Sequence, residues 1–77
     1  MEPRKIFDDG SKTYFEFDGS LSPRIFSVDK VSGKEIPLNS YKQGKYTVVD
    51  KISWQFSLRQ GNDVTCVFNE KLGVWRK

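Results

Sequence analysis

Regular alternation of apolar and polar residues over positions 52–59 is the feature that most limits the folds open to this chain. The segment reads ISWQFSLR, and apolar side chains occupy every second position, namely Ile52, Trp54, Phe56 and Leu58. A period of two over eight residues indicates a β-strand with one face against a core and the other in solvent. We therefore expect Trp54, within the best-patterned strand, to be a core residue.

Similar segments, rich in β-branched and aromatic residues, recur along the whole chain. The clear ones are residues 12–18, 24–29, 45–50 and 63–69, and the weaker ones are 4–8, 34–38 and 72–76. In the first of these, Thr13, Phe15 and Phe17 share one face. No window of ten residues or more has the apolar spacing of an amphipathic helix, and the chain contains no alanine.

Turn sequences separate these segments. Glycine is combined with Asp, Asn or Ser in DDGS at 8–11 and QGND at 60–63, which is typical of chain reversals. Pro37 limits its own short segment to a sheet edge or a loop. The pattern predicts an all-β fold, either a small antiparallel sandwich or a barrel, with seven or eight short strands.

The chain is short enough for one domain with a thin core. Its 77 residues bury only about 60% of the surface that the unfolded chain exposes. With one Cys and no His, neither a disulfide framework nor a metal cluster can compensate. Tight packing or a bound partner must supply the remaining stability.

Catalysis lacks its usual residues. Histidine, the commonest general base, is absent, and Asp8 and Asp9 are adjacent in a turn, where acids are most often solvated. Cys66 has no His partner, and each Gly stands alone in a turn rather than in a phosphate-binding loop. We expect no enzyme and no cofactor or metal.

Nucleic-acid binding is the alternative that the composition leaves open. Tyr14 lies near Lys12 and Tyr46 follows Lys45, as in β-barrels that bind single strands. However, the 13 basic and 10 acidic residues are interleaved along the chain, so no basic groove is indicated. Packing in the core or against a protein is the favoured role of these aromatics.

Cys66 lies in VTCVF on the face that it shares with Val64 and Phe68. Two interpretations remain open. A free Cys among apolar residues is most often a small buried hydrophobe, whereas an odd Cys in an oxidising compartment pairs with another chain.

Four blocks, in this order, resemble the C-terminal domain of the TrbG/TraO family, which includes the ninth VirB-type protein of type IV secretion systems. They are IFDDGSKTYFEF (6–17), PRIF (23–26), VVDKI (48–52) and LRQGNDVTCVFN (58–69). The blocks span most of the chain, while the stretch 32–42 and the end EKLGVWRK depart from the family pattern.

The resemblance implies that residues 1–77 are a single β-sandwich domain, excised from the C-terminal part of a longer protein. It implies a structural subunit of the outer-membrane core complex, in the periplasm at the outer membrane of a Gram-negative bacterium. Its partners would be a short outer-membrane lipoprotein, the channel-lining core subunit and copies of itself in a ring. Nucleic acid is not expected, and membrane contact would come only through partners. In this context Cys66 becomes a candidate for a disulfide with the lipoprotein.

Partner binding by a small β-domain favours an open sheet edge. The segment Lys5 to Phe7 is first in the chain and has a charged start, which is typical of protected edges. Ile6 and Phe7 are consecutive, so one packs inward and the other is left for a partner. Aromatic residues are enriched at interface centres, which adds Tyr14, Tyr41 and Trp75 as candidates.

Overall fold

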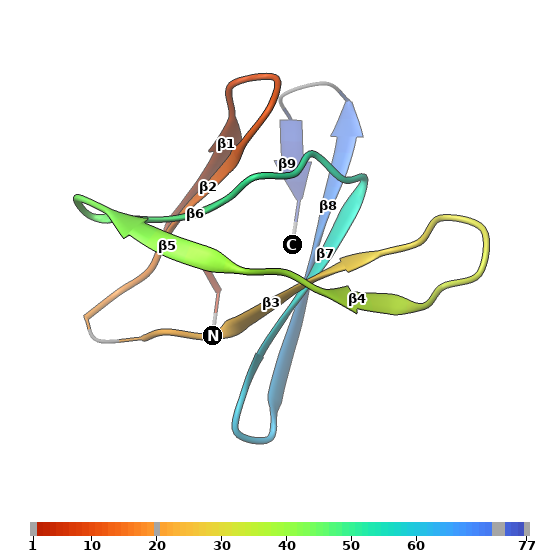
Figure 1. The fold of residues 1–77 in the computed structure, drawn as a ribbon. Helices are drawn as coiled ribbons and strands as arrows, with labels where there is room; N and C mark the ends of the chain where they lie inside the picture. Colours follow the sequence, from red (N-terminus) through yellow and green to blue (C-terminus); the bar gives the residue numbers. More distant parts are fainter. Residues whose placement is uncertain (1, 20, 72–73, 77) are drawn as a thin grey trace.

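The computed structural model describes residues 2–19, 21–71 and 74–76, with the backbone alone from residue 70 onward. These residues contain nine strands and no helix (Figure 1). The strands are β1 (Lys5–Asp8), β2 (Thr13–Glu16), β3 (Arg24–Val28), β4 (Glu35–Pro37), β5 (Ser40–Gln43), β6 (Tyr46–Val49), β7 (Gln55–Gln60), β8 (Asp63–Lys71) and β9 (Val74–Arg76).

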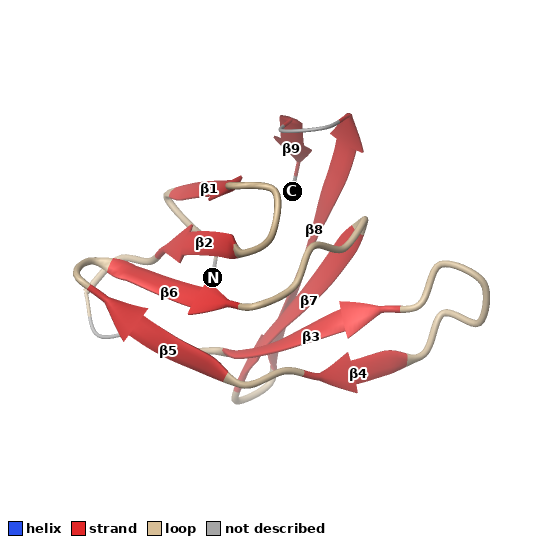
Figure 2. Ribbon diagram, turned by 45° about the horizontal axis from the view of Figure 1, so that its top comes forward, coloured by secondary structure: helices blue, strands red, loops and turns tan. Residues whose placement is uncertain are grey.

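Two antiparallel sheets form the sandwich (Figure 2). The first has the order β1-β2-β6-β5 and the second has the order β4-β3-β7-β8-β9. The chain passes from one sheet to the other where β4 leads into β5, and there the Leu38 N–H donates to the Ile25 carbonyl at 3.0 Å. This crossing closes one side of the sandwich.

The predicted all-β sandwich is confirmed, although the described residues have nine strands where seven or eight were expected. The weak segment 34–38 forms β4, and the additional strand is β5, which the sequence pattern did not predict. Pro37 itself lies on β4 at the edge of the second sheet, as predicted, because an edge strand does not need its missing N–H.

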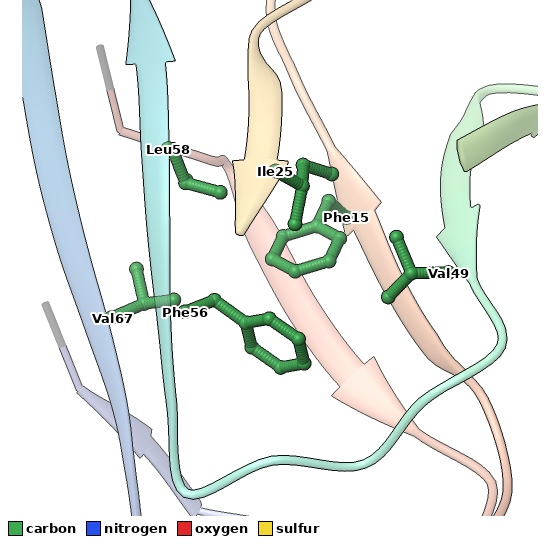
Figure 3. Packing of buried hydrophobic residues seen from close by; sticks show 6 residues of the cluster. All are labelled: Phe15, Ile25, Val49, Phe56, Leu58 and Val67. Carbon is green, nitrogen blue, oxygen red and sulfur yellow. The ribbon is translucent and has the colours of Figure 1, made fainter. Parts of the chain in front are cut away.

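The core lies between the inner faces of the two sheets (Figure 3). Its buried members are Phe15, Ile25, Val49, Phe56, Leu58 and Val67. The rings of Phe15 on β2 and Phe56 on β7 meet edge to face, with 5.4 Å between their centroids and an interplanar angle of 85°. Because β2 and β7 are interior strands of opposite sheets, this contact joins the layers at their centre.

The prediction that Trp54 belongs to the core is wrong. The regular strand begins only at Gln55, because the chain bends at Ser53 and Trp54, where the Ser53 hydroxyl donates to the Gln55 carbonyl at 2.9 Å. The bend breaks the alternation, and 38% of Trp54 is exposed. Its indole N–H donates to the Val28 carbonyl at 3.1 Å, and its ring lies 5.9 Å from that of Phe68.

Asp9 organises the turn between β1 and β2. Its carboxylate accepts from the backbone N–H groups of Ser11 at 3.0 Å and Lys12 at 2.8 Å, and from the Tyr14 hydroxyl at 3.0 Å. These hydrogen bonds, of which the one from the Ser11 N–H has the largest effect, lower the pKa of Asp9 from 3.8 to about 2. Gly10 has φ +94°, a backbone conformation that residues with a Cβ rarely adopt. The turn therefore requires glycine at this position of DDGS.

Two buried threonines on the inner face of the first sheet differ in their hydrogen bonding. The Thr13 hydroxyl donates to the Lys51 carbonyl at 2.7 Å, whereas the Thr47 hydroxyl finds no partner among the described residues. A buried hydroxyl without a partner lowers stability, since it has given up its hydrogen bonds to water.

Replacing Thr47 with Val should therefore raise the free energy of unfolding by about 1 kcal/mol, because the shape is kept and the unpaired hydroxyl is removed. The matched variant Thr13→Val should lower it by about 1–2 kcal/mol, because the Lys51 carbonyl loses its donor. Urea unfolding of both variants measures the difference. Equal effects at the two positions would contradict this assignment of hydrogen bonds.

Asp9 should also make the free energy of unfolding depend on pH in the acidic range. Its pKa is lower in the folded chain than in the unfolded chain, so its stabilisation is complete above about pH 4 and is lost as the pH falls toward about 2. Asp9→Asn keeps an acceptor oxygen but removes the titration. Urea unfolding across this range should show a smaller loss of stability for Asp9→Asn than for the parent chain, and parallel pH profiles would contradict the role of Asp9.

Candidate functional site: an aromatic face beside an edge strand

Four of the residues predicted to bind a partner lie on one surface, the outer face of the first sheet. Cross-strand register places Phe7 opposite Tyr14, Tyr14 opposite Val48, and Val48 opposite Tyr41. Lys5 projects from the same side of β1 as Phe7, since the two are separated by two positions. Ile6 points inward and packs against the core, as expected for one residue of this consecutive pair, while partner binding by Phe7 stays a prediction.

Four aromatic residues lie on this surface, which we call the aromatic face: Phe7, Tyr14, Tyr41 and Tyr46. Phe7 and Tyr14 stack with 4.9 Å between centroids and 4° between planes. Tyr46 meets both rings at its edge, 5.2 Å from Phe7 and 6.0 Å from Tyr14. Sequence analysis did not select Tyr46 as a partner-binding residue. The feature that could have identified Tyr46 is its position in β6, an interior strand of the first sheet.

Val48 shows how much the aromatic face covers. Its side chain belongs to the outer face by register, yet it is fully buried. The side chains that flank it across the sheet are Tyr14 and Tyr41, and 42% of Tyr41 remains exposed. The outer face is therefore a second, partly covered apolar layer rather than a polar, solvated surface.

Charged groups surround the aromatic face. The amino groups of Lys5 and Lys45 each lie 5.5 Å from a ring centroid, over Phe7 and Tyr46 respectively. The hydrogen bond from its hydroxyl to Asp9 raises the pKa of Tyr14. The pKa of Lys12 is raised mainly by Tyr41 and to a smaller extent by Asp50. These raised pKa values favour the neutral form of Tyr14 and the charged form of Lys12.

Strand β1 is an edge of the first sheet, as predicted. It is four residues long, with Lys5 exposed, and Arg4 just before it pairs with Asp18 at 2.9 Å. Strand β9 of the second sheet comes close to β1, but within the described residues it is hydrogen-bonded only to β8. One face of β1 thus carries the stacked Phe7, and the contact of β1 with β9 includes no strand pairing.

Cys66 lies on the outer face of the second sheet, in register with Ser57. It shares this face with Val64 and Phe68, as predicted, but it is half-buried, so full burial as a core residue is not observed. The inward position next to it belongs to Val67, which is fully buried. Both sides of β8 are apolar here, and the alternation alone does not show which side faces the core.

A polar bridge crosses the outer face beside Cys66. Arg59 donates to both carboxylate oxygens of Glu35, at 2.9 and 2.7 Å, and its guanidinium lies 5.8 Å from the Phe26 ring. The hydrogen bond from Arg59 lowers the pKa of Glu35. Ser57 is buried on this outer face, although alternation predicted it to be exposed.

The remaining predicted residue, Trp75, lies on β9, and its side chain is outside the described residues. In the part of the chain that the structure describes, no three His, Cys, Asp or Glu side chains come together as a metal site. A search of the same residues finds no helix long and apolar enough to cross a membrane.

Comparison with known proteins identifies the family. The type IV secretion system protein virB9 of Bartonella quintana is 38% identical over 92% of this chain, and its counterpart in Bartonella henselae is 36% identical over 92%. Protein virB9 of Agrobacterium fabrum is 35% identical over 87%. The chain spans about a quarter of the length of these relatives, 25% for the Bartonella proteins and 23% for the Agrobacterium protein.

The family model CagX, described as a conjugal transfer protein, matches residues 1–70. This match covers all four sequence blocks that carried the resemblance. The chain therefore belongs to the CagX family of conjugal transfer proteins.

Proposed function

We propose that this chain is a non-enzymatic structural subunit of a type IV secretion machine and acts through its aromatic face and the adjacent edge of β1. The observation that carries the proposal is that an apolar layer, made of Phe7, Tyr14, Tyr41 and Tyr46, adjoins an edge strand. Aromatic residues flanked by an open strand edge suit a peptide partner. The names of the two Bartonella relatives, type IV secretion system proteins, support the setting.

The proposed partner at this site is a short outer-membrane lipoprotein. Its extended segment adds a strand to β1, where backbone groups supply affinity and alternate side chains contact Phe7 and Lys5. Covering the outer face buries apolar area that the 77-residue chain leaves half exposed, so binding also stabilises the domain. This fits a chain with a thin core.

The family resemblance supports the wider setting of the proposal. The domain is the C-terminal part of a longer subunit in the outer-membrane core complex, in the periplasm of a Gram-negative bacterium. There it contacts the channel-lining subunit and copies of itself in a ring. Conjugal transfer, the description of the CagX family, is a process that requires such a conduit.

Single-strand nucleic-acid binding is less well supported by the geometry. Bases need free ring faces on which to stack, whereas the Phe7 and Tyr14 rings stack on each other. Lys12 and Lys45 lie near acids, 4.0 Å from Asp50 and 3.9 Å from Glu16. The cationic groove that such binding requires is therefore not formed on this face.

The substitution Phe7→Asp tests the site. It places a charge in the aromatic face but leaves the core between the sheets intact, so it should weaken binding of a lipoprotein peptide at least tenfold, about 1.4 kcal/mol. Calorimetric titration measures the affinity, and circular dichroism checks that the domain stays folded.

The control for this experiment is Asn62→Asp. It adds the same charge at an exposed position in the turn between β7 and β8, on the second sheet and away from the aromatic face. The proposal expects Asn62→Asp to bind like the parent chain. Equal affinities for Phe7→Asp and the parent would remove β1 from the interface, and equal losses for both variants would show only a general effect of charge.

Cys66 supports a second, covalent contact with the same partner. Its thiol is half-buried on an outer face rather than sealed in the core, with Val64 and Phe68 on either side along β8. Strand β9 pairs with β8 and contacts β1, so a segment that leaves β1 and passes β9 comes to the sheet that carries Cys66. We propose a disulfide between Cys66 and the lipoprotein.

Co-expression of this chain with the lipoprotein in an oxidising compartment should give a heterodimer band on a non-reducing gel. The band should disappear with reductant and in Cys66→Ser, while calorimetry of the reduced proteins should still show binding. A Cys66→Ser sample that keeps the band, or a parent sample without it, would contradict the disulfide.

A further inference from the structure

The loop between β3 and β4 carries the most exposed large apolar side chain among the described residues. This loop, residues 29–34, extends away from both sheets (Figures 1 and 2). Val31 at its tip is 96% exposed, so it contributes almost nothing to the core. The tip is a projecting surface that none of the described residues covers.

The loop satisfies its own backbone. The Asp29 carboxylate accepts from the N–H groups of Val31 at 2.8 Å and Ser32 at 3.2 Å, and the Asp29 carbonyl accepts from Gly33 at 2.8 Å. The Asp29 N–H donates to the Lys34 carbonyl at 2.9 Å, which closes the hairpin. These satisfied N–H groups reduce the cost of moving the tip out of water.

Positive charge and a tryptophan adjoin the tip. The Lys30 amino group lies 5.9 Å from the Trp54 ring centroid, and Lys51 is close enough to contribute to the lowered pKa of Asp29. Lys34, at the other end of the loop, is exposed. Because Trp54 already donates its N–H to Val28, its exposed part is the apolar ring.

The acidic groups nearby are already engaged. Asp29 is turned into the loop by the bonds to Val31 and Ser32, and Glu35 is held by Arg59. Asp29 keeps its negative charge, but the three lysines outnumber it, so an approaching surface meets a net positive charge. An apolar apex with lysines around it and a tryptophan at its base is the composition of a segment that binds a membrane interface.

We propose that the β3–β4 hairpin tip, with Val31 at its apex and Lys30, Lys34 and Lys51 around it, docks on an anionic lipid surface. The lysines pair with lipid phosphates while Val31 and the Trp54 ring contact the acyl boundary. A bilayer is favoured over a protein partner because the tip is convex and its bonded N–H groups are not available for strand pairing. This contact is direct, unlike the partner-mediated one expected from the family resemblance.

Vesicle co-sedimentation tests this proposal with the 77-residue chain, without any lipoprotein. Vesicles of mixed phosphatidylglycerol and phosphatidylcholine should bind the chain, and vesicles of phosphatidylcholine alone should not. Val31→Ser should reduce binding about tenfold, and Lys30→Glu at least fivefold, the contribution of about one lysine. Circular dichroism confirms that each variant is folded.

The matched control is Lys42→Glu, which makes the same change in net charge on β5, on the other side of the molecule in Figure 1. The proposal requires Lys42→Glu to bind like the parent chain and soluble polyglutamate to compete poorly. Equal losses for Lys30→Glu and Lys42→Glu, or no effect of Val31→Ser, would overturn it. Strong binding of polyglutamate that is insensitive to Val31→Ser would instead assign the tip to an acidic protein.

Discussion

The edge-to-face contact between Phe15 and Phe56 is the interaction on which the two-layer structure depends. Each ring comes from an interior strand, and together they fill the centre of a core that has only a few other large side chains. With the space between the sheets filled, most other aromatics lie on the outer faces. Phe7, Tyr14 and Tyr46 cover the first sheet, and Phe26, Trp54 and Phe68 cover the second. The thin core and the aromatic outer layers are two results of the same packing limit.

Alternation predicted the inward side chains wherever a strand was regular. Thr13 and Phe15 on β2 face inward as expected, and so do Phe56 and Leu58 on β7. The alternation failed at Trp54 because the chain bends there, which shifts the phase of the pattern. The bend involves a local hydrogen bond that the composition does not reveal. The alternation missed β5 because all four residues of SYKQ are exposed, which leaves no apolar face to detect.

The candidate site was only partly predictable for a different reason. Alternation within a strand places Lys5 and Phe7 on the same face. That Phe7, Tyr14 and Tyr41 share one face, however, depends on the register between strands that are distant in sequence. Register also explains the position of Cys66. Its neighbours on the strand were assigned correctly, yet the side with Val64, Cys66 and Phe68 is the outer one, because Val67 faces the Phe56 side of the core.

The order of strands in the second sheet separates the two proposed contact regions. Strand β9, beside β1, lies at one edge of that sheet, and β4, which forms half of the projecting hairpin, lies at the other. A peptide that pairs with β1 and passes β9 toward Cys66 approaches from the β9 edge, whereas Val31 and its lysines extend from the β4 edge. The two contacts therefore need no shared residues. A domain with this arrangement can hold its peptide partner and rest against a lipid surface at the same time.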